Sequence, residues 1–353
     1  MPELRRDPII DRWVIIAENR GKRPGAFAAG TSIELPLATT APSAHADEEE
    51  VCPFCPGNER ETPPATFESR DDAGQPDAAG WRVRIVPNKY PALIDQEVAE
   101  SLRDPDFSPP PQSLFASAPA AGVHEVIIDT PRHVTTVGEL TDAELSESLL
   151  AIRARLQSLR RRTDLAHALV FRNVGRAAGA TRSHIHSQLM ATQSVASLIR
   201  AELEGAKQFF DEHRQCVFCR MIAEECTLAQ RVVGDSAEFI GLCPYASRFP
   251  YETWILPKRH ASHFEQIAVE DLDDLVRLAR GTIARIERLS QPAAYNLIFH
   301  TSPFDSLATE HYHWHIEIIP RLTIPAGFEW GSGWAVNPVS PETAAGVLRT
   351  MEG

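Results

Sequence analysis

The stretch Ser183-His184-Ile185-His186-Ser187-Gln188 places two histidines two positions apart and follows them with a serine and a glutamine. Side chains at positions i and i+2 of an extended segment point to the same face, so the histidines are predicted to share one face of a strand. The preceding residues, 171–182, include Gly175 and Gly179, and such a loop lets backbone N–H groups approach an anion closely. The combination indicates a histidine that attacks or holds a phosphoryl group. Taken alone, a His-x-His pair is equally consistent with a half-buried polar strand.

Length and charge narrow the class of protein. The chain has 353 residues, of which 43% are hydrophobic, and a formal net charge of −13. The length predicts about two domains with a sizeable core, and the negative charge argues against a general nucleic-acid binder. The first residues lead into no apolar segment of a signal peptide, and no run reaches the ~18 apolar residues of a membrane helix. We therefore expect a cytoplasmic protein that binds neither nucleic acid nor membrane.

Four of the six cysteines form two Cys-x-x-Cys pairs, Cys52-Pro53-Phe54-Cys55 and Cys216-Val217-Phe218-Cys219. In a reducing compartment, such pairs indicate metal ligands or redox centres rather than structural disulfides. Cys226 and Cys243 lie outside the pattern, and we expect them to be ordinary thiols.

The two cysteine pairs begin two copies of one pattern: Cys-x-x-Cys, strands, a histidine, a helix, a strand and His-x-His. His133 precedes His184 by 51 residues, and His260 precedes His313 by 53. Near-equal spacing predicts an internal duplication. We therefore predict an α+β fold of two tandem halves, residues 1–195 and 196–353, each an antiparallel sheet with one crossing helix, around a shared core.

The helices of this pattern carry their own signals. A capping box, Thr141-Asp142-Ala143-Glu144, precedes leucines and isoleucines near a 3.6-residue period, which predicts an amphipathic helix. Glu270-Asp271-Leu272 opens the matching helix of the second half. A further helix is predicted near residues 195–212, with Leu198, Ile199, Leu203 and Phe210 on one face.

Cysteine and histidine are the ligands that zinc prefers, and structural zinc sites usually have four of them. The repeat predicts one set in each half: Cys52, Cys55, His133 and His184, and then Cys216, Cys219, His260 and His313. A closed set of four leaves no open position, so these ions are predicted to be structural. His263 is an alternative to His260, and a redox pair or a site without metal is the alternative to zinc.

At these motifs the chain resembles the galactose-1-phosphate uridylyltransferase family of the histidine-triad superfamily. The likeness runs through residues 13–24, the first cysteine pair, residues 86–88 and 131–133, residues 173–188, and both motifs of the second half. The family pattern His-Pro-His-Gly/Ser-Gln stands here as His184-Ile185-His186-Ser187-Gln188. The change of proline to isoleucine leaves both histidines and the glutamine in place.

The resemblance implies a ping-pong nucleotidyl transfer. His186 would attack the α-phosphorus of a nucleoside diphosphate sugar, a sugar 1-phosphate would leave, and a second phosphate acceptor would take the nucleotide from the histidine. Gln188 would stabilise charge on the phosphate oxygens. His186 is preferred over His315 because the glycine loop precedes it and Ser-Gln follows it. The resemblance also implies a homodimer and these substrate contacts: Arg20, Arg23, Asn88, Asn173, Gly179, Thr181 and Phe328.

The identity of the donor and the acceptor stays open. UDP-glucose with a hexose 1-phosphate, as in galactose-1-phosphate uridylyl transfer, is the favoured reaction. The alternative is the ADP-glucose phosphorylase branch, because Ser332-Gly333 stand where the galactose enzymes have a Tyr-Glu pair, and because the second Cys-x-x-Cys is retained. A histidine-triad hydrolase is a further alternative, against which Gln188 speaks. A non-enzymatic zinc protein that binds nucleotides is the last.

Overall fold

The computed structural model describes residues 3–6, 13–16, 51–70, 77–101, 114–115, 117–289, 292–305, 309–324, 327–333, 335 and 337–351. Arg20 and Arg23, two predicted substrate contacts, lie outside these residues, and of Phe328 the structure describes the backbone alone.

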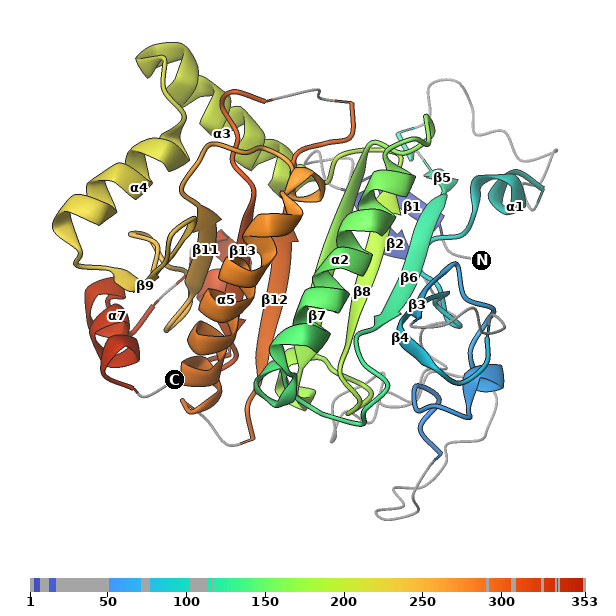
Figure 1. The fold of residues 1–353 in the computed structure, drawn as a ribbon. Coiled ribbons are helices and arrows are strands. Elements are labelled where there is room, and N and C mark those ends of the chain that lie inside the picture. The colour runs from blue at the N-terminus through green and yellow to red at the C-terminus, as the bar shows by residue number, and fades with distance from the viewer. Residues whose placement is uncertain are drawn as a thin grey trace.

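A ten-stranded antiparallel sheet forms the centre of the molecule (Figure 1), and its strand order confirms the duplication. The order in the first half is β3-β4-β6-β8-β7, and the second half repeats it as β9-β10-β11-β13-β12. The halves meet where β7 pairs with β12. The strands of the first half are β3 (Phe67–Arg70), β4 (Trp81–Pro87), β6 (Gly122–Ile128), β7 (His167–Val174) and β8 (His186–Thr192). Those of the second half are β9 (Val232–Asp235), β10 (Phe239–Leu242), β11 (Thr253–Pro257), β12 (Tyr295–His300) and β13 (His315–Pro320).

One crossing helix from each half covers the same face of this sheet, as predicted. These helices, α2 (Asp142–Leu159) and α5 (Leu272–Glu287), lie side by side in Figure 1. The capping box predicted at Thr141 and Glu144 begins α2. The apolar faces of both helices enter a single cluster of buried residues that spans the two halves. The expectation of one shared core is therefore confirmed.

The remaining elements surround the large sheet. A small sheet has the order β2-β1-β5, from β1 (Glu3–Arg6), β2 (Trp13–Ile16) and β5 (Ser117–Pro119). The other helices are α1 (Gln96–Ser101), α3 (Ser197–His213), α4 (Val217–Leu228), α6 (Gly327–Ser332) and α7 (Pro341–Thr350). Among the described residues, no helix is both long and apolar enough to cross a lipid bilayer.

Three local expectations need correction. The predicted apolar face of α3 is only partly buried, since Leu198 is 64% exposed while Ile199 is buried. Helix α4 was not predicted: Cys216 is its N-cap, so the second cysteine pair begins a helix, whereas the first lies in a turn. Strand β8 begins at His186, so His184 lies just before the strand rather than in it.

A buried ion pair lies beneath strand β8. Arg172 of β7 contacts Asp129 at 2.8 Å, and the exposed fractions of the two side chains are 2% and 0%. Arg172 also donates to the hydroxyl of Ser187, and Ser148 of α2 donates to Asp129. Ser187 alternates with His186 and Gln188 along the strand, so it faces the side of the sheet opposite to theirs. The pair therefore ties β8 to its neighbours from the core side.

Removing one member of this pair leaves a buried charge without a partner. We expect Arg172→Met to lower the free energy of unfolding by about 3–5 kcal/mol, as measured by chemical denaturation. The control is Lys207→Met, which breaks the exposed Lys207–Asp211 pair and is expected to leave the free energy of unfolding almost unchanged. Equal losses in the two variants would contradict the assignment.

Candidate functional site

A pocket of about 650 Å³, partly open to solvent, lies against the face of β8 that carries His186 and Gln188. The pocket brings together four of the predicted site residues, Asn88, Thr181, His186 and Gln188. Asn173 and Gly179 lie outside its lining. Other residues that line the pocket are Pro53, Phe54, Glu61, Lys89, Tyr90, Val126 and Arg182.

The ring of His186 is held in one orientation by the backbone. Its Nδ1 lies 2.8 Å from the carbonyl oxygen of His184. A carbonyl accepts but does not donate, so Nδ1 carries the proton and, in the neutral ring, Nε2 carries the lone pair. The ring of Phe54, from the first cysteine pair, lies 5.2 Å from the His186 ring. The histidine therefore has the tautomer that a nucleophile at Nε2 requires.

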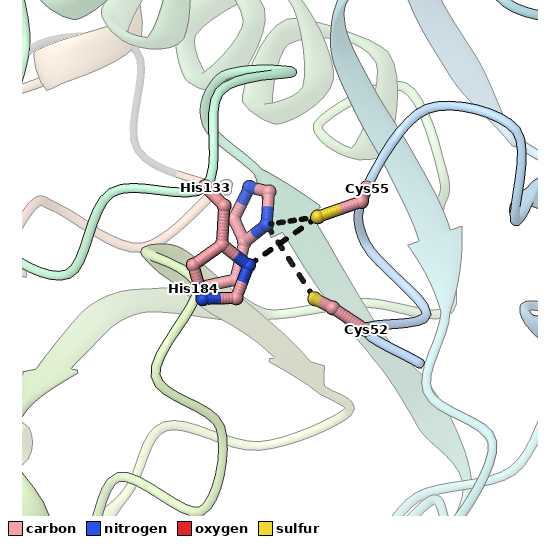
Figure 2. A group of neighbouring side chains, drawn as sticks. All are labelled: Cys52, Cys55, His133 and His184. Carbon is pink, nitrogen blue, oxygen red and sulfur yellow. Dashed lines mark hydrogen bonds between the residues drawn. The ribbon is translucent and has the colours of Figure 1, made fainter. Parts of the chain in front are cut away.

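The first predicted metal group comes together from three separate segments (Figure 2). Nδ1 of His184 lies 3.6 Å from the sulfur atoms of both Cys52 and Cys55, and Nδ1 of His133 lies 3.3 Å from that of Cys55. A tetrahedral zinc ion, with about 2.3 Å to sulfur and about 2.0 Å to nitrogen, separates such ligand atoms by about 3.5 Å. The donor set and its spacing therefore fit one ion held between the four side chains.

The second predicted group has the same arrangement. Cys216, Cys219, His260 and His313 present ligand atoms that all lie within 4.8 Å of one another. Nδ1 of His260 lies 3.3 Å from the sulfur of Cys219, and Nδ1 of His313 lies 3.6 Å from it. His263, the alternative to His260, contacts Ser262 and the carbonyl of Pro303 instead. Two groups able to hold a metal ion are therefore present, one in each half.

Backbone carbonyls orient a histidine of each possible metal group. Nε2 of His184 lies 2.9 Å from the carbonyl oxygen of Thr130, and Nε2 of His313 lies 2.8 Å from that of Pro257. Donation from Nε2 leaves the Nδ1 lone pair for the ion, an arrangement common around protein-bound metals. Burial lowers the pKa of His184 to about 4, which keeps the ring neutral and able to ligate.

The glycine loop differs from the open anion cradle expected of it. Gly175 and Gly179 adopt positive φ angles of 77° and 88°, which glycine accommodates without strain. The N–H groups of Ala178 and Ala180 donate to the carbonyl of Gly175, and that of Gly179 donates to Arg176. These three amides are already paired within the loop. In the pocket lining the segment is represented by Thr181 and Arg182 instead.

Asn173 lies at the end of β7 and is held by the second half of the chain. Its Oδ1 accepts a hydrogen bond of 2.8 Å from Asn296 of β12, and Asn296 also donates to the carbonyl of Ala178. One asparagine from the second half thus fixes both Asn173 and the glycine loop of the first half.

Comparison with known protein families shows which family the chain belongs to. Residues 1–196 match the N-terminal domain of galactose-1-phosphate uridyl transferase, and residues 202–329 match its C-terminal domain. The chain belongs to the galactose-1-phosphate uridyl transferase family. As a member of this family of uridylyltransferases, it is a nucleotidyltransferase.

Individual relatives cover almost the whole chain. It is 33% identical to the ADP-glucose phosphorylase of Arabidopsis thaliana, across 99% of this chain and 93% of that protein. It is 26% identical to the galactose-1-phosphate uridylyltransferase of Thermotoga maritima, across 100% of this chain and 99% of the relative. The structure of the Arabidopsis thaliana ADP-glucose phosphorylase with bound ADP-glucose is similar, with a TM-score of 0.74, 29% identity and 100% coverage of both chains.

The second half of this family member carries a closed counterpart of the pocket. Val126 of β6 pairs with Gln188, and the matching pair between β11 and β13 is Trp254 with Glu317. Val126 lines the pocket, whereas the Trp254 ring stacks on His315 at 4.7 Å. His315 is fully buried as a result. The tryptophan therefore fills the space that stays open beside His186.

A third group of possible metal ligands lies beside this closed site, and the sequence analysis did not identify it. It consists of Glu202, His300 and His315. Burial acts to lower the pKa of His300, but hydrogen bonds to Glu202 and Glu317 outweigh it and raise the pKa to about 9. Glu202 lies on α3, so no local spacing in the sequence connects it to the two histidines.

The sequence analysis also missed several residues of the pocket, including the cations Lys89 and Arg182. Their positions offered a signal, because Lys89 follows Asn88 and Arg182 directly precedes the Ser-His-Ile-His stretch. Phe54 could have been found from its position inside the first cysteine pair.

The metal groups can be tested by removing their sulfur ligands. We expect the double variant Cys52→Ser/Cys55→Ser to lose one bound metal ion per chain, as measured by inductively coupled plasma mass spectrometry, because two neutral hydroxyls replace two thiolates. The corresponding Cys216→Ser/Cys219→Ser variant loses the other ion. Cys226→Ser changes an exposed cysteine outside both groups and serves as the control with full metal content. Unchanged metal in a double variant would contradict that group.

Proposed function

We propose that the protein transfers a nucleotidyl group from a nucleoside diphosphate sugar to a phosphate acceptor through a covalent intermediate on His186. The observation that carries the proposal is the hydrogen bond between Nδ1 of His186 and the carbonyl of His184, in a pocket shared with Gln188. It leaves the Nε2 lone pair to attack the α-phosphorus. The bond from phosphorus to the bridging oxygen breaks, and a sugar 1-phosphate leaves. An acceptor phosphate oxygen then attacks the same phosphorus, the P–N bond breaks, and the imidazole is regenerated.

The polar groups around the pocket suit the charge that develops on phosphorus. The Gln188 amide supplies a hydrogen-bond donor, and Lys89 and Arg182 supply positive charge. Fixed donors of this kind contribute most where charge grows in the transition state, and the loss of one typically costs about 10²–10³ in rate. We further assign Asn88, Asn173, Gly179 and Thr181 to substrate binding, Gly179 and Asn173 through the shape of the loop.

Zinc is the ion we propose for both cysteine–histidine groups, since two thiolates with two imidazoles are typical structural zinc ligands. A bound ion of this kind supplies folding free energy and cross-links the segments that hold it. His184 is thereby fixed, and its carbonyl fixes His186. The homodimer and the division of the chain into residues 1–195 and 196–353 belong to the same proposal.

Two donors are compatible with this chemistry. UDP-glucose is the donor favoured by the family that the chain belongs to. ADP-glucose is favoured by a specific observation: identity to the Arabidopsis thaliana ADP-glucose phosphorylase is 33%, against 26% to the Thermotoga maritima uridylyltransferase. With ADP-glucose the acceptor would be inorganic phosphate, and with UDP-glucose it would be a hexose 1-phosphate.

The covalent step can be tested by intact mass spectrometry of the purified protein after incubation with UDP-glucose or ADP-glucose and no acceptor. We expect one nucleotidyl group on the wild type and none on His186→Ala. The sample is kept out of acid, because phosphorus–nitrogen bonds hydrolyse there. The sugar nucleotide that forms the adduct faster identifies the nucleotide that the protein transfers.

The matched variant for this experiment is His315→Ala, which changes the equivalent histidine of the second half. It is expected to keep the adduct. Labelling that persists in His186→Ala but disappears in His315→Ala would contradict the assignment of the nucleophile. Absence of an adduct from the wild type with both donors would overturn the covalent mechanism.

A further inference from the structure

We propose that His124 is a positioning residue for the nucleotidyl transfer: it holds the side-chain amide of Gln188 so that the amino group faces the reacting phosphate. The inference rests on the proposed function for its consequence in catalysis. His124 lies on β6 and is 4% exposed. Its Nε2 is 3.1 Å from Oε1 of Gln188, and its Nδ1 is 3.0 Å from the backbone nitrogen of Ala92.

The contact with Ala92 fixes where the proton of the ring lies. A backbone N–H can only donate, so Nδ1 of His124 must accept and carries no proton. The neutral ring therefore has its proton on Nε2. Nε2 lies 3.1 Å from Oε1 of Gln188 and 3.1 Å from Nδ2 of Asn88. The Asn88 amino group is not an acceptor, because its Oδ1 is the atom that receives the N–H of Tyr90. Oε1 of Gln188 is an acceptor, so it can receive the Nε2 proton.

This donation determines which end of the Gln188 amide is available to a ligand. With Oε1 bound to His124, the amino group makes no hydrogen bond among the residues that the structure describes. Gln188 and His186 alternate on one face of β8 and both line the pocket. The amino group is thus left to donate to a phosphate oxygen. An amide turned by 180° would present its oxygen instead and repel the same phosphate.

The second half has a glutamate at the same point of the repeat. Val126 matches Trp254 through the strand register, so the position two residues earlier, His124 in the first half, is Glu252 in the second. The Trp254 indole N–H lies 3.2 Å from both Glu252 and Glu317, and Glu317 matches Gln188. Glu252 lies directly before β11 and shares the Trp254 N–H with Glu317, so in both halves this position lies near the residue two places after the second histidine of His-x-His. The first half, whose pocket is open, has the imidazole of His124 at this position.

The kinetic test compares two substitutions at this position. His124→Leu keeps an apolar body but cannot donate to Gln188, whereas His124→Gln can donate through its own amino group. We expect His124→Leu to slow formation of the nucleotidyl adduct about 10-fold or more, somewhat less than the 10²–10³ expected when the donor itself is removed. His124→Gln should recover most of the rate. Equilibrium binding of AMP and UMP should change less than about 3-fold, since the effect is on the transition state.

The matched control is His167→Leu, which removes another buried histidine whose Nε2 contacts the carbonyl of Thr301 away from the pocket. It should lose stability without slowing the adduct. Equal rates in His124→Leu and wild type would overturn the proposal. So would equal slowing in His124→Gln and His124→Leu at matched stability, because that result indicates a purely structural role.

A second measurement does not depend on catalysis. Long-range proton–nitrogen correlation spectra of the wild-type protein report the tautomer of each imidazole, and the His124→Gln spectrum identifies the signal of His124. We expect a neutral ring protonated at Nε2. A ring protonated at Nδ1, or at both nitrogens, would overturn the inference even if no adduct forms with either sugar nucleotide. Failure of the adduct alone would instead count against the proposed function.

Discussion

The hydrogen bond from Nδ1 of His186 to the backbone carbonyl of His184 connects the pocket histidine to the first group of possible metal ligands. The His184 side chain belongs to a group of possible metal ligands, and its carbonyl sets the tautomer of the pocket histidine. Phe54, from the cysteine pair of the same group, lies against the His186 ring. In the proposed mechanism, a metal ion bound to this group would therefore act on the reactivity of His186 without contacting it. It would do so through position, in the way that partners beyond the direct ligands tune metal and catalytic sites generally.

The duplication shows how one of two similar sites came to be closed. Both halves have a cysteine–histidine group, a phenylalanine against the second histidine, and a bond from that histidine to the carbonyl two residues before it. The difference lies in the neighbouring strand, where Val126 leaves space and Trp254 fills it. Filling the space brings Glu252, Glu317 and His300 into a buried polar network around His315. The repeated frame thus carries a pocket beside His186 in the first half and a tryptophan stacked on His315 in the second.

The features that sequence analysis predicted are those with a local or a repeated signal. The eight cysteines and histidines of the two possible metal groups could be identified because their types and spacing recur in both halves. The capping box and apolar periodicity were enough for α2. Features that depend on strand register were not accessible: the roles of His124 and Trp254 follow from which residues lie beside Gln188 and Glu317 in space. Helix α4 was missed because the predicted repeat has strands as the next elements after each cysteine pair.

The division between strand and loop also explains why the reaction type is better determined than the donor. His186 and Gln188 lie on β8, near the middle of the first half of the sheet and tied from its core side by Ser187 to Arg172. A site on such a strand is held rigidly, and its chemistry is read directly from its residues. Lys89, Thr181 and Arg182 line the pocket from the loops after β4 and before β8. Loops tolerate substitution and often carry specificity. In the proposed function, the residues of β8 are compatible with uridylyl or adenylyl transfer, and the residues of the surrounding loops determine which nucleotide is bound.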